Sequence, residues 1–261
     1  MKRRVLLGTL EIVVPVAILG LITWWTARAD SFFFPPVTEV LEAFRETWLF
    51  DSFFADAVPS MYRLLAGYAL AVVAGVVLGT VIGISWRARR MSAPVVEFLR
   101  ALPAPAAIPF FILVFGIGDM AKILLIGLVT IWPVLLNTVD GIAGIDATLM
   151  ETARMYNIGR MDMLLRVRLP AALPRIYAGM RTSLSLAIVL MMVSEMVAST
   201  NGIGRSVLVA QSLFDIPKMW SGILLLGVLG YLLNVLFEFQ ERRVLDWHLA
   251  SSGVGGVGKA Q

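Results

Sequence analysis

The chain has 261 residues, of which 59% are hydrophobic and 15% charged, and its net charge is +4. A mean hydropathy of +0.84 is well above that of a water-soluble domain and indicates a protein that lies largely in lipid. With no cysteine and one histidine, His248, thiolate chemistry is excluded, and a zinc site would have to consist almost wholly of carboxylates.

Six apolar runs are each long enough to cross a bilayer as a helix, in which every backbone group is satisfied internally. They lie at about residues 6–26, 60–84, 93–115, 123–142, 176–197 and 221–239. The fold class expected is therefore an all-α membrane protein with six transmembrane helices. Most of the 22 Lys and Arg residues, counting Arg100 among them, fall on the side of the two termini. This bias predicts that both termini and the loop after the fourth run are cytoplasmic. The basic residues stand between apolar runs and not along one aromatic-rich surface, which argues against nucleic-acid binding.

The first run has an alternative interpretation, because basic residues 2–4, an apolar stretch and residues 27–29 (ARA) imitate a secretory signal peptide. The stretch is longer than a signal core, and Trp24 and Trp25 lie where an interfacial aromatic anchor belongs, which favours a retained helix. Residues 37–49 then predict an amphipathic helix. Its apolar face either lies on the outer interface or docks an outside partner.

Small residues recur at every fourth position of the second run, at Ala71, Gly75, Gly79 and Gly83. One face of that helix is nearly bare backbone, which predicts close packing against a neighbouring helix.

The third run contains Pro103, Pro105 and Pro109, which remove hydrogen-bond donors and disfavour a straight helix. Broken backbone at membrane depth has to be buried in protein or line a cavity. Pro105 and Pro109 are therefore weak candidates for the wall of a substrate pathway, and simple buried kinks are the alternative.

The loop after the fourth run, residues 146–175, is too long for a plain connector and is full of helix signals. Asp146 can cap a helix that runs to about Tyr156, and residues 157–159 (NIG) tolerate left-handed turn geometry. A second helix is predicted over residues 160–168.

Pro170 and Pro174 are expected to stop that second helix. The resulting helix-turn-helix knob carries both apolar and basic side chains. Such a knob can fill a groove on a soluble partner.

Within this loop, Glu151-Thr152-Ala153, three residues, Asn157, nine residues and then residues 167–170 (VRLP) resemble a known motif. The match is to the EAA loop of binding-protein-dependent ABC importer permeases, whose pattern is E-A-A, three residues, G, nine residues, I-x-L-P. Thr152 replaces the second alanine and Asn157 replaces the glycine. Because asparagine is the non-glycine residue most at ease with positive φ, the turn is expected to survive.

The resemblance covers nearly the whole chain and points to the sulfonate, taurine, nitrate and bicarbonate permease group. The segments that carry it are residues 35–36 (PP), 101–110 (ALPAPAAIPF), 115–118 (FGIG), 193–196 (VSEM), 201–204 (NGIG) and 241–247 (ERRVLDW). It implies a type I ABC importer permease fold with cytoplasmic EAA coupling helices. Residues 1–57 would form the first transmembrane helix and a periplasmic amphipathic segment. Residues 58–245 would form the permease core with its EAA loop at 146–170, and residues 246–261 a flexible cytoplasmic tail.

The resemblance also implies the partners. Two permease copies, expected to be a homodimer, form the pore in the bacterial inner membrane and contact its lipid, and two ABC ATPase subunits grip their EAA loops. A periplasmic or lipid-anchored solute-binding protein delivers a small solute, expected to be an anion. ATP and magnesium belong to the ATPase subunits, and this chain is expected to bind no cofactor. The ATPase-coupling positions are Glu151, Ala153, Asn157, Leu169 and Pro170.

Residues 253–259 (GVGGVGK) fit the start of a phosphate-binding P-loop, but no strand precedes them and Ala260 stands where Ser or Thr would hold magnesium. We interpret them as part of the tail.

Ionisable residues in or near the runs mark a pathway or a partner, since charge in lipid is costly. They are Glu11, Glu97, Asp140 and Glu195. A carboxylate would repel an anionic substrate, so gating or bracing is expected of Glu195, with a structural ion pair between helices as the alternative.

Weaker pathway candidates are the neutral donors Asn137, Ser183 and Ser185. No catalytic arrangement can be assembled, so the chain is not expected to be an enzyme. The alternative function is a stand-alone secondary transporter or channel, which needs no ATPase. The sequence leaves the identity of the substrate open.

Overall fold

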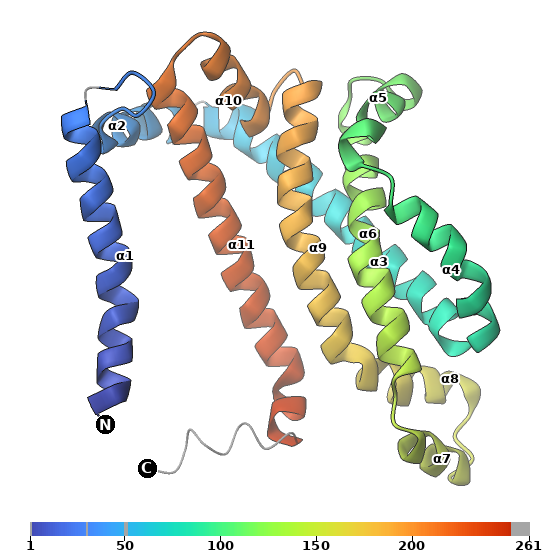
Figure 1. The fold of residues 1–261 in the computed structure, drawn as a ribbon. Helices are drawn as coiled ribbons and strands as arrows, with labels where there is room; N and C mark the ends of the chain where they lie inside the picture. The colour runs from blue at the N-terminus through green and yellow to red at the C-terminus, as the bar shows by residue number, and fades with distance from the viewer. Residues whose placement is uncertain (1, 30, 50–51, 252–261) are drawn as a thin grey trace.

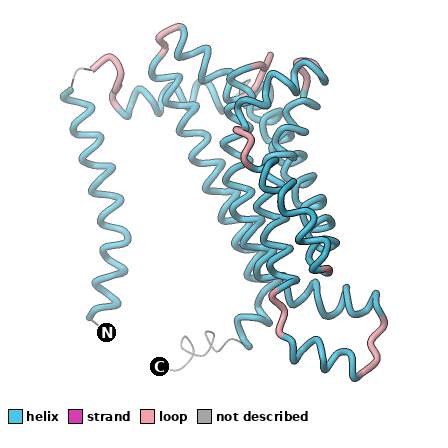
Figure 2. Tube along the Cα trace, turned by 45° about the vertical axis from the view of Figure 1, so that its right-hand side comes forward, coloured by secondary structure: helices cyan, strands magenta, loops and turns pink. Residues whose placement is uncertain are grey.

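The computed structural model describes the backbone of residues 2–29, 31–49 and 52–251, and the side chains of most of residues 13–28 and of residues 31–49 and 52–246. This part of the chain is helical apart from short connections (Figure 2). In chain order the elements are α1 (Lys2–Ala29), α2 (Val37–Trp48), the π-helical turn η1 (Phe53–Ala57), α3 (Val58–Ile84), α4 (Trp86–Arg100), α5 (Ala104–Phe115), α6 (Asp119–Ala143), α7 (Ala147–Met155), α8 (Arg160–Asp162), the π-helical turn η2 (Met163–Arg168), α9 (Leu169–Val197), α10 (Ile203–Ser212) and α11 (Ile216–Ser251).

Four helical segments are long and apolar enough to cross a membrane, and they contain α3, α6, α9 and α11. They confirm the second, fourth, fifth and sixth predicted runs. The first run falls in α1, a helix of 28 residues whose stretch Val16–Arg28 is apolar. With the bent third run, the described residues hold four or five crossing segments where six were predicted.

The third run is two helices joined at a sharp bend, which is either one broken span or a re-entrant loop. The chain breaks between Arg100 and Ala104, and the axes of α4 and α5 meet at 88°. A break was predicted from the prolines, but only Pro103 lies in it. Pro105 falls in the first turn of α5, where a missing N–H costs nothing, and Pro109 is accommodated inside the same helix.

Close packing of α3 is confirmed, and its neighbour is α6. A Cβ added at Gly75 would lie 2.8 Å from the Val134 Cβ, and one added at Gly79 would lie 2.7 Å from the Thr138 Cβ. Real Cβ atoms do not approach so closely, so these positions admit only glycine. The two helices run parallel and in contact along their length, as the small-residue spacing requires.

The amphipathic helix α2 is partly covered by the chain itself. Trp48 is buried against Ile203, Val207 and Leu225, and its indole Nε1 donates a hydrogen bond of 3.1 Å to the Ser221 Oγ. The apolar face is therefore anchored on α10 and α11 at Trp48, while Leu41 on the same face stays 53% exposed.

The molecule has two dissimilar ends (Figure 1). The helices α2, α5 and α10 gather at one end. At the other lie the start of α1, the end of α11 and the pair α7–α8, which projects beyond α6 and α9. The loop singled out from the sequence thus lies at the same end as the start of α1 and the end of α11.

Candidate functional site

The predicted knob, residues 146–168, forms as a compact projection made of α7, a turn, α8 and η2. Asp146 caps α7, because its Oδ1 accepts hydrogen bonds from the backbone N–H of Thr148 (2.7 Å) and of Leu149 (3.2 Å). The Leu149 N–H and then the Thr148 hydroxyl and N–H lower the pKa of the Asp146 carboxyl below its usual range. The predicted cap is confirmed, and it is ionised at neutral pH.

The turn after α7 is a Schellman motif centred on Asn157. Asn157 has a φ of 50°, the left-handed geometry expected at this position. Its N–H donates to the Arg154 carbonyl (2.9 Å), and the Ile158 N–H donates to the Ala153 carbonyl (3.3 Å). These are the two bonds that define the motif, so Asn157 does the work of the glycine that it replaces.

The surface of the knob is largely uncovered. Of the proposed coupling positions on it, Glu151 and Asn157 are exposed, and only Ala153 is buried, at 5% of its surface. Large apolar side chains are nevertheless exposed here: Leu149 44%, Met155 83%, Tyr156 79%, Met161 67% and Leu165 55%. Met155 and Met161 form this apolar surface together with the two leucines and Tyr156. Apolar side chains concentrated on a segment beyond the membrane helices mark a surface for another protein.

The second helix of the knob does not stop at Pro170 and Pro174, so that prediction is wrong. The chain stays helical from Arg160 through η2 and α9 to Val197, a run of 38 residues. In the π-helical turn the Leu169 N–H bonds to the Leu164 carbonyl, and this wider turn directly before Pro170 accommodates the donor that the proline lacks, while Pro174 lies inside α9. The knob is therefore one piece with a membrane helix.

Leu169 and Pro170 lie at the root of the knob and are half-buried. Leu169 packs against the cluster formed by Ile142, Ala172 and Ile176, which joins α6 to α9. The root of the knob is thus packed against two membrane helices.

At the opposite end of α9, Glu195 is 1% exposed and its carboxylate is fully bound. Oε1 receives the Arg63 Nη1 at 2.7 Å, and the Ser60 hydroxyl lies 2.8 Å from both oxygens. The Gly204 N–H donates to Oε2 at 3.0 Å. Glu195 thereby holds α9, α3 and α10 together, which is the geometry of a brace.

Arg63, which is 3% exposed, is the centre of this cluster. Its Nε donates to Asp119 Oδ1 at 2.7 Å, and its Nη2 donates to the Asn201 side chain at 2.5 Å. Asp119 begins α6, so a fourth helix joins the brace. Sequence reasoning missed Arg63, although a lone arginine at the start of an apolar run was the available signal.

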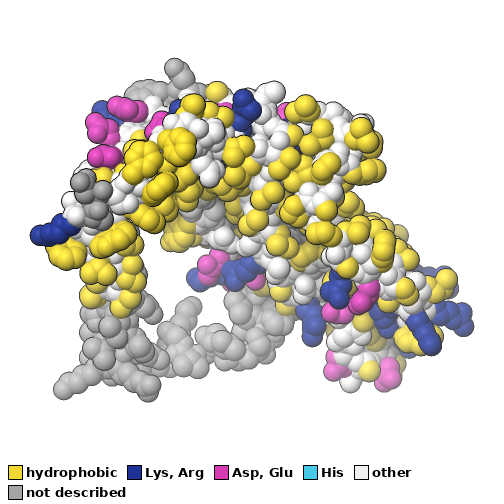
Figure 3. Space-filling model, turned by 45° about the horizontal axis from the view of Figure 1, so that its top comes forward, with side chains coloured by type: hydrophobic (Ala, Val, Ile, Leu, Met, Phe, Trp, Pro, Cys, Tyr) yellow, Lys and Arg dark blue, Asp and Glu magenta, His cyan; other side chains and the backbone are white. Residues whose placement is uncertain are grey.

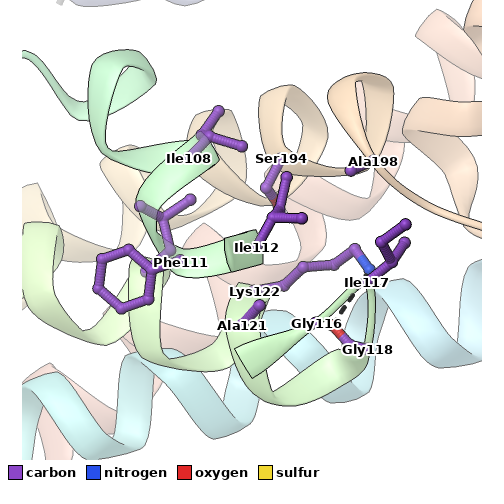
Figure 4. A pocket seen from close by; sticks show the side chains of 11 residues that line it. Ile108, Phe111, Ile112, Gly116, Ile117, Gly118, Ala121, Lys122, Ser194 and Ala198 are labelled. Atoms are coloured by element: carbon purple, nitrogen blue, oxygen red, sulfur yellow. Dashed lines mark hydrogen bonds between the residues drawn. The ribbon is translucent and has the colours of Figure 1, made fainter. Parts of the chain in front are cut away.

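Beside this cluster, a small cavity of about 10 Å³ lies between α5, α6 and α9 (Figure 4). Lys122, 5% exposed, borders it and donates to the Gly118 carbonyl at 3.3 Å. The space admits about one water molecule, so the turn between α5 and α6 is closed onto α9.

The neutral pathway candidates lie in the middle of α6 and α9. Asn137 Nδ2 donates to the Pro133 carbonyl (2.8 Å), Ser183 Oγ to the Thr130 carbonyl (2.7 Å) and Ser185 Oγ to the Arg181 carbonyl (3.5 Å). Ser183 is fully buried between the two helices and Ser185 is exposed. Pro105 and Pro109 are exposed on α5, away from these residues.

Near the same depth, a groove of about 530 Å³ opens between α4, α6 and α9. Glu97 and Arg100 line it, with Trp132, Leu136 and Leu186. The charge count had assigned Arg100 to the cytoplasmic side, but the break after α4 brings it beside the middle of α6.

Other features add no site. The described residues contain no group of three or more His, Asp or Glu side chains that could hold a metal ion. The P-loop-like residues 253–259 and the side chains of Glu11 and His248 lie outside the described residues. Asp140 is exposed near the end of α6 that carries the knob.

Comparison with known proteins shows what the architecture is similar to. Residues 71–246 match the family model described as "Binding-protein-dependent transport system inner membrane component". The putative aliphatic sulfonates transport permease protein SsuC of Bacillus subtilis (strain 168) is 36% identical, over 84% of this chain and 79% of the relative. The taurine transport system permease protein TauC of Escherichia coli (strain K12) is 28% identical, over 93% of this chain and 89% of the relative. The nitrate import permease protein NrtB of Leptolyngbya laminosa is 31% identical, over 74% of this chain and 69% of the relative.

Among solved structures, a chain of the MetNI methionine ABC transporter in an inward facing conformation matches with a TM-score of 0.62. The two chains are 20% identical, and the match covers 72% of this chain and 94% of the other. At that identity the likeness shows the fold, which is the type I importer permease fold.

Proposed function

The chain belongs to the family of binding-protein-dependent transport system inner membrane components. We propose below how it acts as the transmembrane permease subunit of an ATP-driven importer. Its partners are ABC ATPase subunits and a solute-binding protein, and it lies in the membrane with several crossings. It is a transport protein and not an enzyme. We infer that its solute is a small anion, because relatives are named for sulfonates, taurine and nitrate.

The knob is the proposed ATPase contact, and the observation that carries this proposal is its exposed apolar surface outside the membrane helices. Glu151 and Asn157 lie on that surface, Ala153 packs beneath it, and Leu169 with Pro170 joins it to α9. Closure of the ATPase subunits would move the knob, and the continuous helix would carry the motion along α9 into the membrane. ATP and magnesium would stay on the ATPase subunits.

The orientation follows from the same argument. The ATPase subunits use cytoplasmic ATP, so the knob would face the cytoplasm, and the start of α1 and the end of α11, at the same end, would be cytoplasmic too. Since the chain has no native cysteine, a Tyr156→Cys variant offers a single label. A membrane-impermeant thiol reagent should reach it from the cytoplasmic side and not from the outside.

Two copies of this chain are proposed to pair around a twofold axis, because one small bundle cannot enclose a pathway with a site at its centre. The mass of the purified complex checks this. Two permeases with two ATPases is the expected composition. A functional monomer would contradict the pairing, and a paralogous second permease would replace the homodimer by a heterodimer.

Reconstitution tests the function as a whole. The permease, its ATPase and its binding protein are placed in liposomes, and uptake of taurine, ethanesulfonate and nitrate is measured with ATP present or absent. Uptake should require ATP and the binding protein and should persist when ionophores collapse the ion gradients. Uptake driven by a gradient without the ATPase would instead support the secondary transporter.

A further inference from the structure

A second functional element lies in the groove of about 530 Å³ between α4, α6 and α9. Trp132 and Leu136 line it from near the middle of α6, and Leu186 lines it from near the middle of α9. The groove therefore lies about half-way along the two helices that cross the membrane, at the depth where a transporter has to hold its solute.

Two charged side chains line the groove at this depth, Arg100 and Glu97. The side chain of Arg100 is 49% exposed and that of Glu97 is 70% exposed. Arg100 Nη2 donates a hydrogen bond of 3.3 Å to Glu97 Oε1. A guanidinium has five N–H donors, so this bond leaves most of the fork available. In Figure 3 hydrophobic side chains cover most of the face, and Lys and Arg side chains lie mainly along its edges.

An ionised pair half-way across a bilayer is costly against lipid and is found facing a bundle interior or a water-filled cavity. The break between α4 and α5 supports the second environment. Arg100 is the last residue of α4, and the 88° bend that follows leaves the backbone of residues 101–103 outside any helix. Such backbone is tolerated at membrane depth where it lines a cavity.

From these features we propose that the groove is an anion subsite of the translocation pathway, with Arg100 as the group that binds the solute. The ligand is a small oxyanion of single charge, a sulfonate, nitrate or carboxylate, whose oxygens match the planar guanidinium fork. The proposal rests on the permease function inferred above. Glu97 is the resident counter-ion: it keeps Arg100 paired when the groove is empty and gives way to the arriving anion. Trp132 and Leu136 supply an apolar wall for the rest of the solute.

The experiment uses the absence of native cysteine, so that one introduced thiol reports on the groove. Leu136→Cys is made in the full-length permease, purified with its ATPase subunits. Its reaction rates are measured with a sulfonate-bearing methanethiosulfonate (MTSES) and with a trimethylammonium analogue (MTSET). The anionic reagent is itself a small sulfonate. The MTSES rate divided by the MTSET rate measures the local electrostatic potential. Arg100→Gln should lower this ratio roughly fivefold or more, because it removes a positive charge. Arg100→Lys should keep it, because it keeps the charge.

Two controls fix the interpretation. Glu97→Gln should shift the ratio the other way, because it removes the counter-ion. Val81→Cys, exposed on α3 and expected to face lipid, should react slowly with both reagents. Leu186→Cys on the opposite wall repeats the measurement if Leu136→Cys does not assemble.

An unchanged ratio in Arg100→Gln overturns the subsite, and so does a groove cysteine that is inert to both reagents in every nucleotide state. Neither rate depends on ATP-driven uptake. A failure of the subsite is therefore distinguishable from a failure of the permease function, which the reconstitution tests separately. With the ratio shifted as expected, reduced uptake of the anions by Arg100→Gln in complexes that retain ATPase activity supports the proposed role.

Discussion

At one end of α9 the charged side chain of Glu195 is buried and bound on every side, whereas at the other end the knob leaves Glu151, Tyr156 and Met155 exposed. The first region is complete within the chain, because a single arginine, Arg63, satisfies groups from several helices. The second region has a well-formed backbone and a surface with nothing on it. From this difference we infer that the Arg63–Glu195 cluster is a fixed part of the molecule and that the knob is the part that moves.

A buried network resists rearrangement, since breaking it leaves a charge in an apolar interior. The helix pair of the knob can move as a unit without breaking a buried ion pair. Because α8, η2 and α9 are continuous, the knob and the Arg63–Glu195 cluster lie at opposite ends of one helical segment. We expect the knob to deliver motion and the brace to keep the far ends of α3, α6, α9 and α10 together.

The largest effect is expected from Arg63→Met, which leaves Glu195 buried without its cation. The loss should be about 3–5 kcal/mol of stability, measured as a lower thermal unfolding temperature of the purified permease. Arg100→Met is the matched control, because that arginine also pairs with a glutamate but is half-exposed, and its change should stay below about 1 kcal/mol. Equal losses in the two variants would mean that burial does not distinguish the pairs.

The pair itself can be tested with Arg63→Met combined with Glu195→Met. Replacing both partners by apolar side chains removes the uncompensated charge, so the double variant should be more stable than Arg63→Met alone. A double variant that is less stable would indicate that Ser60 and Gly204, left without their acceptor, contribute more than the ion pair.

A smaller effect is expected at the turn of the knob. Asn157→Val forces a β-branched side chain to a φ of 50° and should cost about 1–3 kcal/mol locally. ATPase binding and uptake should fall while the thermal stability of the membrane helices stays unchanged. Asn157→Gly is the control and should bind and transport normally, because glycine accepts the same geometry. Normal coupling in Asn157→Val would show that the shape of the turn does not matter.

The smallest effect is expected at the cap of α7. Asp146→Ala removes the acceptor for the N–H groups of Thr148 and Leu149, so these two amides should exchange with deuterium faster. Asp146→Asn keeps an oxygen acceptor and should protect them.

The pH dependence of this cap has a definite sign. The pKa of Asp146 is lowered in the folded chain, so the cap is fully present above the ordinary pKa of about 3.9 and is lost as the pH falls through the lower folded value. Exchange of the two amides, corrected for its intrinsic pH dependence, should therefore show constant protection between about pH 5 and 8. Protection that declines within that range would contradict the assignment.

Local features were predictable from the sequence, because neighbours in the chain decide them. Asp146 predicted a helix cap and Asn157 a left-handed turn, and the structure contains both. The stop predicted at Pro170 was not correct, because the π-helical turn directly before it changes the hydrogen-bond pattern and accommodates the donor that the proline lacks.

Long-range features were not predictable from spacing. Glu195 was recognised as a possible brace, but Arg63 lies far from it in the sequence, and nothing local pairs them. Two motifs quoted for the resemblance acquire a physical reason only in the fold. Gly202 has a φ of 121°, and a Cβ there would lie 2.5 Å from the Glu195 carboxylate. The glutamate of residues 193–196 and the glycines of residues 201–204 therefore require each other.

The central claim is that the exposed knob is the contact through which the ATPase subunits drive the permease, and binding of the ATPase to a Glu151→Lys permease tests it most directly. The site lies outside the membrane helices, so the variant should insert and fold as the wild type does. The account predicts that its affinity for the ATPase falls by about tenfold or more and that uptake is lost, with Glu151→Gln intermediate. An affinity equal to that of the wild type, with normal uptake, would contradict the account and return the stand-alone transporter to consideration.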